Sequence, residues 1–169
     1  RAMAGDIVAF SPPLVITELM YHPTPPPAGN TNDSDNFEYI ELKNRGGSPL
    51  NLIGFRFTNG IDFTFTATSG VTNLGPGQRV VVVQNRAAFS SRYPAATSIA
   101  GEYLGNLDNS GERLALLGSL LEPIHDFRYE NAWYPITDGL GFSLVIADEN
   151  AALATWTNQA SWRPSGVAD

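Results

Sequence analysis

The chain has 169 residues, a formal net charge of −7 at neutral pH and no cysteine. This length favours one domain with its own core, and the hydrophobic share of 43% is that of a globular chain. Disulfides and thiolate metal sites are excluded, and the acidic charge disfavours binding to the phosphates of nucleic acids. No apolar run approaches the roughly 20 residues that cross a bilayer, so we expect no membrane insertion.

The two ends of the chain are expected to lie outside the fold. The first ten residues, RAMAGDIVAF, lack the basic and then apolar pattern of an export signal, and the RAMA start resembles a cloning remnant. The final segment, 158–169, is interpreted as a last strand that runs into a linker. We therefore assign 1–13 to a partly cloning-derived tail, 14–166 to a single domain and 167–169 to a linker remnant.

Short segments rich in β-branched and aromatic residues alternate with glycines and prolines along the whole chain. Even spacing of this kind favours an all-β sandwich or barrel. The segment 79–84 is apolar on both faces and is expected to be a central strand that is covered on each side. The pattern predicts about nine strands, at 14–20, 37–43, 51–58, 62–67, 79–84, 98–104, 113–118, 124–129 and 142–147.

One short surface helix is predicted near 86–93. Asn85 can cap its first turn, Phe89 and Tyr93 recur at helical spacing, and Pro94 ends it. The segment 23–36 is rich in Pro, Asn and Asp, so we expect an exposed loop there.

Two glutamates, Glu38 and Glu41, lie in the predicted strand 37–43. Successive side chains of a strand alternate between faces, so these two are expected to point to opposite sides and cannot flank one glycosidic bond. Glu38 shares the core face with Ile40 but lies at the start of the strand, where it can still reach water. Glu41 is expected on the solvent face. Both charges are interpreted as structural.

The two histidines, His22 and His125, do not indicate a nucleophilic active site. His125 adjoins Asp126, but neighbours in a strand face opposite ways, so the pair cannot form the hydrogen bond that a Ser-His-Asp site needs. The sequence also lacks the HExxH, P-loop and GxSxG motifs. We therefore expect no catalytic activity.

Aspartates in turn-like segments are candidate ligands of calcium, which binds six to eight oxygens. No segment matches the spacing of a calcium loop in full, and Asp is also a common turn residue. Calcium is thus the one cofactor that the sequence leaves open, and none is required. The candidates are Asp33, Asp35, Asp108 and Asp138.

Aromatic residues late in the chain are candidates for facing a ligand, because exposed rings stack on sugars. Aromatic residues of an all-β domain more often pack in the core or at sheet edges, so both interpretations stay open. The candidates are Trp133, Tyr134, Trp156 and Trp162.

Several further segments follow one another in a characteristic order over residues ~14 to 166. They are VITELMYHP (15–23), YIELKN (39–44), NLIGF (51–55), LGPGQRVVVV (74–83), the pair Phe89 and Tyr93, NLDNSGERLALL (106–117), DGLGFSLV (138–145) and WRPSG (162–166). Together they resemble the lamin tail domain in its bacterial extracellular form.

This resemblance implies an immunoglobulin-like β-sandwich that serves as an interaction or scaffolding module without catalytic residues. Lamin members engage protein partners and chromatin, but this chain lacks a basic surface for DNA and its segment 23–36 is longer than the lamin pattern. Bacterial members look like appendages of large exported proteins. We therefore expect an extracellular or cell-surface module that binds a protein, cell-surface or polysaccharide partner. A calcium-assisted carbohydrate-binding module is the alternative, and a small hydrolase is a third.

Overall fold

The computed structural model of the chain describes residues 11–169, so most of the predicted tail lies outside the described residues. The strands are β1 (Leu14–Met20), β2 (Tyr39–Asn44), β3 (Leu50–Asn51), β4 (Arg56–Asn59), β5 (Phe63–Thr64), β6 (Asn73–Leu74), β7 (Arg79–Val83), β8 (Ile99–Glu102), β9 (Arg113–Leu117), β10 (Pro123–Arg128), β11 (Leu144–Ile146) and β12 (Trp162–Pro164). The helices are α1 (Arg86–Arg92) and the short 3₁₀ turns η1 (Ser34–Phe37), η2 (Asn131–Trp133), η3 (Pro135–Thr137), η4 (Leu153–Thr157) and η5 (Gln159–Ser161).

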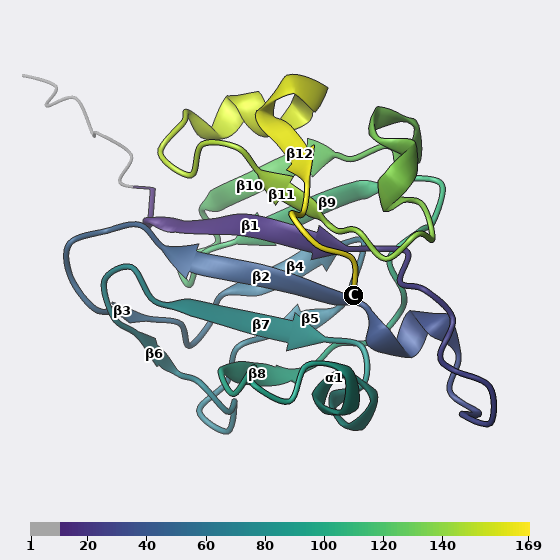
Figure 1. Cartoon of the computed structure of the whole chain (residues 1–169). Helices are drawn as coiled ribbons and strands as arrows, with labels where there is room; N and C mark the ends of the chain where they lie inside the picture. The colour runs from purple at the N-terminus through teal and green to yellow at the C-terminus, as the bar shows by residue number, and fades with distance from the viewer. Residues whose placement is uncertain (1–10) are drawn as a thin grey trace, which may run out of the picture.

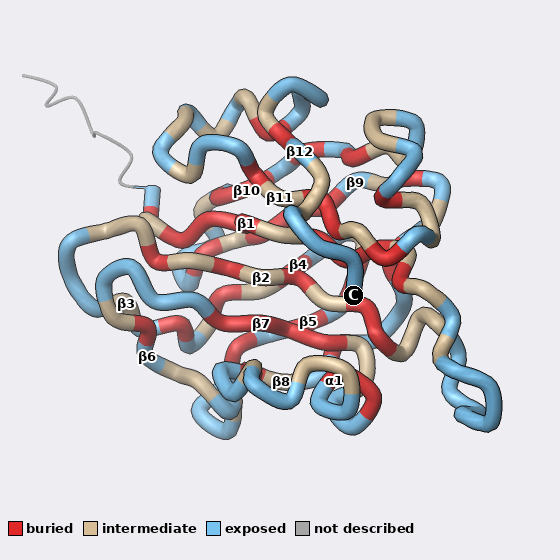
Figure 2. Tube along the Cα trace, in the orientation of Figure 1, coloured by how far each residue is buried: buried red, intermediate tan, exposed pale blue. Residues whose placement is uncertain are grey.

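The strands form two main layers (Figure 1). One sheet has the order β12-β11-β1-β2-β7-β8 and the other has the order β10-β9-β4-β5, with β3 and β6 as a small separate pair. Neighbouring strands are antiparallel except β7 and β8, which are parallel and are joined through α1. Buried residues follow β1, β2 and β7 (Figure 2). The predicted immunoglobulin-like all-β sandwich is confirmed.

The strand β7 is covered on both faces, as its all-apolar sequence predicts. Val80 and Val82 belong to the main core between the sheets, whereas Val81 and Val83 pack with Phe89 of α1 in a smaller cluster. The expected helix near 86–93 is therefore present, and it serves as the outer cover of one end of the larger sheet.

The described residues contain twelve strands rather than the predicted nine. The segment 51–58 is divided into β3 and β4 by a turn at Gly54, whose φ of 92° is readily reached only by glycine. The two residues of β6 are too few to show an alternation in the sequence. The final predicted strand is present as β12. Residues 167–169 continue along the larger sheet. The division into a tail, a domain at 14–166 and a linker remnant stays a prediction.

The backbone of Ile16 in β1 is held by two side chains instead of a strand. β11 pairs with β1 only at Glu18 and Leu19. The Ile16 N–H donates to His125 Nε2 at 3.1 Å, and Trp156 Nε1–H donates to the Ile16 carbonyl at 2.9 Å. Both side chains are buried, with their ring centroids 5.3 Å apart. They satisfy two backbone groups that would otherwise be buried without partners.

Replacing Trp156 with Phe should show how much the hydrogen bond from Trp156 to the Ile16 carbonyl contributes to the stability of the fold. The Phe ring keeps an aromatic group in the core but leaves the Ile16 carbonyl without its donor, so we expect the free energy of unfolding to fall by about 1–3 kcal/mol. Urea denaturation measures the change. Trp133→Phe is the matched control, because the Trp133 indole donates no hydrogen bond within residues 11–169 and the residue is only partly buried. Equal losses in the two variants would contradict the role of the hydrogen bond.

Candidate functional site

One cross-strand row on the outer face of the larger sheet brings two carboxylates together. A β-bulge at Thr17 shifts the register of β1, so that Glu18 lies directly opposite Glu41 of β2. On the other side, Val145 of β11 lies opposite Glu18, and Arg163 of β12 lies opposite Val145. Directly opposed like charges destabilise a sheet, so the pairing of Glu18 with Glu41 does not serve the stability of the fold.

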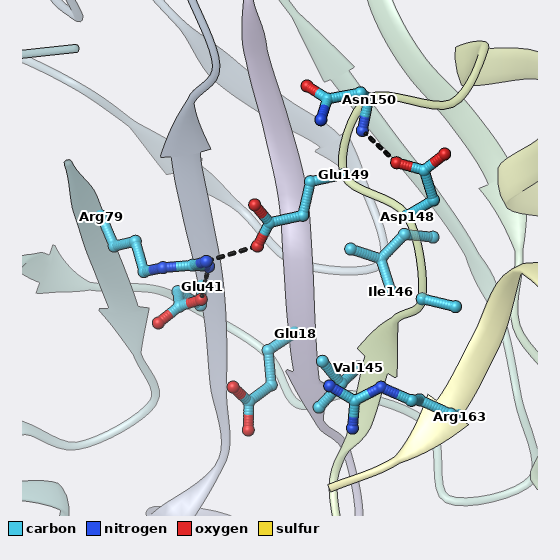
Figure 3. A pocket seen from close by; sticks show the side chains of 10 residues that line it. Glu18, Glu41, Arg79, Val145, Ile146, Asp148, Glu149, Asn150 and Arg163 are labelled. Atoms are coloured by element: carbon cyan, nitrogen blue, oxygen red, sulfur yellow. Dashed lines mark hydrogen bonds and ion pairs between the residues drawn. The ribbon is translucent and has the colours of Figure 1, made fainter. Parts of the chain in front are cut away.

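The row lines a hollow of about 460 Å³ (Figure 3). We call it the Glu18 pocket. Four carboxylates and two guanidinium groups line it, which leaves a formal charge of −2. These groups belong to Glu18, Glu41, Asp148, Glu149, Arg79 and Arg163.

The Glu41 side of the pocket is neutralised by ion pairs. Arg79 donates to Glu41 Oε1 at 2.6 Å and also pairs with Glu149, which Lys43 contacts in turn. Thr17 Oγ1 donates to the same Glu41 oxygen at 2.7 Å. Desolvation acts to raise the pKa of Glu149, but the hydrogen bonds from Lys43 and Arg79 outweigh it and hold this pKa below its usual value. The charges of Glu41, Glu149, Arg79 and Lys43 are therefore paired with one another.

Glu18, by contrast, is held by hydroxyl groups and not by a cation. Tyr39 Oη donates to Glu18 Oε1 at 2.7 Å, and Ser143 Oγ donates to the same oxygen at 2.5 Å. Within residues 11–169, Glu18 Oε2 accepts no hydrogen bond, and Glu18 makes no ion pair. The Arg163 guanidinium, in the same described range, bonds only to the Pro164 carbonyl, at 3.1 Å. The pocket thus contains one oriented carboxylate and one guanidinium without ionic partners in the described part of the chain.

Glu38 is fully buried, so the prediction that it can reach water is wrong. Its Oε2 accepts hydrogen bonds from Tyr103 Oη at 2.9 Å and from the Leu107 N–H at 2.8 Å, because the segment after β8 folds over it. Its Oε1 has no partner among the described residues. Desolvation raises the pKa of Glu38 to about 8, although both hydrogen bonds act to lower it. Glu41 lies on the outer face, so the predicted separation of the two glutamates is confirmed.

His125 is also buried and does not contact Asp126. Its Nε2 accepts from Ile16, which places the proton on Nδ1, and Nδ1 has no partner among residues 11–169. Asp126 points outward and forms a bidentate pair with Arg113 at 2.6 and 2.7 Å. Desolvation, assisted by the charge of Arg45, lowers the pKa of His125 to about 3. The predicted separation of His125 from Asp126 is confirmed.

The other histidine forms a pair that the sequence analysis missed. His22 Nδ1 lies 2.6 Å from Oδ1 of Asp138, and both side chains are about one-third exposed. Asn131 Nδ2 donates to the second oxygen of Asp138 at 3.2 Å. No hydroxyl group in residues 11–169 is hydrogen-bonded to His22, so this pair does not form a catalytic triad there. The two partners are 116 positions apart, and no local pattern links them.

A comparison with known protein families identifies the family of this chain. The model of the Lamin Tail Domain matches residues 9–129. The chain belongs to the lamin tail domain family. Lamin tail domains are immunoglobulin-like and, as a rule, non-catalytic interaction modules. No curated protein matches the chain. Within residues 11–169 of this lamin tail domain, no helix combines the length and the apolar character that a membrane span needs.

The calcium candidates of this lamin tail domain take part in separate local contacts. Asp33 caps η1 by accepting from the Asp35 N–H at 3.3 Å. Asp35 accepts from Asn106 at 2.9 Å, and Asp108 accepts from the N–H and the hydroxyl of Ser110 within its own turn. The fourth candidate is the partner of His22. In the described residues no three acidic or histidine side chains are grouped as a metal site. Calcium binding stays a prediction that these contacts do not support.

Two of the aromatic candidates lie in the core, so the prediction that they face a ligand is wrong. Trp156 and Trp162 are 0% and 1% exposed, and the Trp162 indole donates to the Trp156 carbonyl at 2.8 Å. An indole can be buried in this way because its one polar group finds a backbone acceptor. Trp133 and Tyr134 are partly buried against the same core. A sugar-binding role for these two stays a prediction.

Glu38 and His125 make the stability of the lamin tail domain depend on pH in opposite directions. The pKa of Glu38 is raised from 4.5 to about 8. The stabilisation that the protonated Glu38 side chain gives the folded state is therefore fully present below pH 4.5 and is lost as the pH rises towards 8. The pKa of His125 is lowered from 6.5 to about 3, so its contribution is present above pH 6.5 and is lost as the pH falls towards 3.

Glu38→Gln should remove the loss of stability on the alkaline side. Between pH 4.5 and 8 we expect the free energy of unfolding of the wild type to fall by roughly 3–5 kcal/mol more than that of the variant. Denaturant titrations at a series of pH values give the difference. Glu102→Gln, at an exposed position of the same sheet, is the control and should keep the wild-type profile. If the Glu38→Gln and wild-type profiles run parallel, Glu38 does not carry a buried proton.

Proposed function

We propose that this lamin tail domain is a non-catalytic interaction module of a larger exported protein, and that it attaches this protein to a protein partner through the Glu18 pocket. The observation that carries the proposal is the carboxylate of Glu18, which two hydroxyl groups orient and which no cation neutralises in the described residues. A charge held in this way is prepared for a basic group from another molecule.

Along the row that contains Glu18, an acceptor, an apolar residue and a donor follow one another. Glu18 offers a hydrogen-bond acceptor, Val145 offers an apolar floor, and Arg163 offers a donor two strands away. Adjacent strands lie ~4.8 Å apart, so the two charges belong to positions roughly 10 Å apart across the sheet. A protein segment fits this row if it directs a Lys or Arg side chain to Glu18 and a carbonyl or carboxylate to Arg163.

The opposition of Glu18 and Glu41 supports a binding role. Arg79 relieves the repulsion by pairing with Glu41, but Glu18 has no such pair in residues 11–169. A like-charge pair at directly opposed positions costs stability, on the order of 0.2–1 kcal/mol. An apolar or basic residue at position 18 would avoid this cost, whereas a carboxylate there is useful to a site that binds cations.

The arrangement of reactive groups is consistent with a module that performs no chemistry. Catalysis needs a nucleophile, a base and charge-stabilising donors that converge on one point. Glu41 and Glu149 are ion-paired, and His125 is buried. His22 follows the far end of β1 and is therefore distant from Ile16, the residue that His125 contacts. Export is part of the proposal because the chain resembles bacterial extracellular members of the family. Fractionation of cells that express the full gene product tests this part separately.

Glu18→Gln should weaken binding to basic peptides without altering the fold. The amide oxygen of Gln can still accept from Tyr39 and Ser143, while the charge is lost. A charge-assisted hydrogen bond contributes about 1.5–3 kcal/mol, so we expect affinity for Lys- or Arg-containing peptides to fall about 10- to 100-fold. A peptide library screened against the immobilised domain identifies the ligands, and calorimetry measures the affinities.

Two comparisons make this test specific. Glu102→Gln removes one exposed carboxylate elsewhere on the sheet and should bind like the wild type. Arg163→Ala should weaken mainly those peptides that carry an acidic group beside the basic one. If the library yields no basic peptides, or if Glu18→Gln binds them as tightly as the wild type does, the proposal is wrong.

A further inference from the structure

A second polar site on the same face holds the side chain of Asp169. Asp169 Oδ2 accepts hydrogen bonds from Arg92 at 2.6 Å and from Tyr93 Oη at 3.2 Å, and Oδ1 accepts from Thr24 Oγ1 at 3.1 Å. The Asp169 N–H donates to the Gly141 carbonyl at 2.7 Å. The side chain of Asp169 is 2% exposed. We call Thr24, Arg92, Tyr93 and Gly141 the aspartate cradle.

Arg92 is fixed in this cradle by contacts that do not involve Asp169. Its guanidinium carbon lies 3.7 Å from the ring centroid of Phe37, and it also donates to the Thr24 carbonyl at 3.1 Å. The Arg92 side chain is 13% exposed. A cation that is stacked on a ring and bonded to backbone keeps its orientation when a carboxylate leaves, so a new carboxylate would find a prepared partner.

Gly141 leaves the space that the Asp169 carboxylate occupies against the backbone of the cradle. A Cβ atom at this position would lie 2.4 Å from Asp169 Oδ1 and 3.2 Å from Thr24 Cγ2. The φ of Gly141 is 85°, a value that side-chain-bearing residues rarely adopt. The absence of a side chain is what allows the carboxylate to approach the backbone this closely.

The segment that carries Asp169 is attached mainly at its two ends. The Ser165 N–H donates to the Ser143 carbonyl at 2.9 Å, and the next main-chain hydrogen bond along the described chain is that of the Asp169 N–H to the Gly141 carbonyl. Between them the segment crosses the outer face of the sheet (Figure 1), with Val167 78% exposed over a hollow of about 130 Å³. Main-chain pairing combined with one pocketed side chain is how an extended peptide adds to a sheet.

We propose that the aspartate cradle is a binding site for an extended, aspartate-bearing segment of a partner protein, and that residues 165–169 occupy it in cis in this structure. Three donors around the carboxylate select an acid, and the bond from the backbone N–H to Gly141 sets the distance to the side chain. An Asp side chain fits this distance, a Glu side chain is one methylene too long, and an Asn side chain lacks the charge that pairs with Arg92.

The test uses the whole chain carrying Asp169→Ala, which frees the cradle of its carboxylate while the rest of the protein stays intact. The probe is the peptide Ser-Gly-Val-Ala-Asp with a C-terminal amide, added at up to millimolar concentration and followed by heteronuclear NMR. We expect it to bind the variant about ten-fold more tightly than the wild type, in which Asp169 competes. The peptide ending in Asn should bind at least about ten-fold more weakly than the Asp peptide.

Further variants locate the binding within the molecule. Adding Thr24→Val to Asp169→Ala removes one donor with little change in shape and should weaken the Asp peptide several-fold. Adding Arg113→Ala instead removes an exposed arginine of the opposite sheet and should leave this binding unchanged, which separates a loss at the cradle from a general loss of positive charge. The proposal is overturned if the Asp and Asn peptides bind equally, or if neither binds an Asp169→Ala chain whose spectrum is that of a folded protein.

Discussion

The gap in strand pairing at Ile16 is the constraint on which the rest of the sandwich depends. β1 lies at the centre of the larger sheet, yet β11 reaches only its second half. His125 comes from the opposite sheet and Trp156 comes from η4, and both close the gap by hydrogen-bonding to the same residue. The two layers and the C-terminal segment therefore meet at one point of the backbone, where no water is needed to satisfy it.

This constraint also joins the part of the chain beyond the family match to the fold. The lamin tail match ends at Tyr129, but Trp156 and Trp162 belong to the same core as β1 and β9. β11 and β12 then extend the larger sheet and supply Val145 and Arg163 to the polar row. The outer face is thus composite: Glu18 and Glu41 come from the matched region, and their neighbours across β11 do not.

Local periodicity predicted what depends on local geometry. The alternation in 37–43 correctly placed Glu38 and Glu41 on opposite faces, and the apolar run of β7 correctly indicated a strand covered twice. It could not predict what distant segments do. The burial of Glu38 depends on Leu107, 69 positions away, and the burial of Trp156 depends on an acceptor at Ile16, 140 positions away. The bulge at Thr17, which turns Glu18 outward, interrupts the very alternation used for prediction.

The two polar sites of the outer face have opposite charge requirements and share one border. Glu18 lines both the acidic pocket and the hollow beneath residues 167–169, so the sites are adjacent along the sheet. In the two proposals, one site offers a carboxylate to a basic group, and the other offers Arg92, which binds Asp169 in this structure, to an acid. A segment that reversed its direction along β11 would place like charges together at both sites, which costs affinity at each. If both proposals hold, the face would specify the direction of a bound segment as well as its composition.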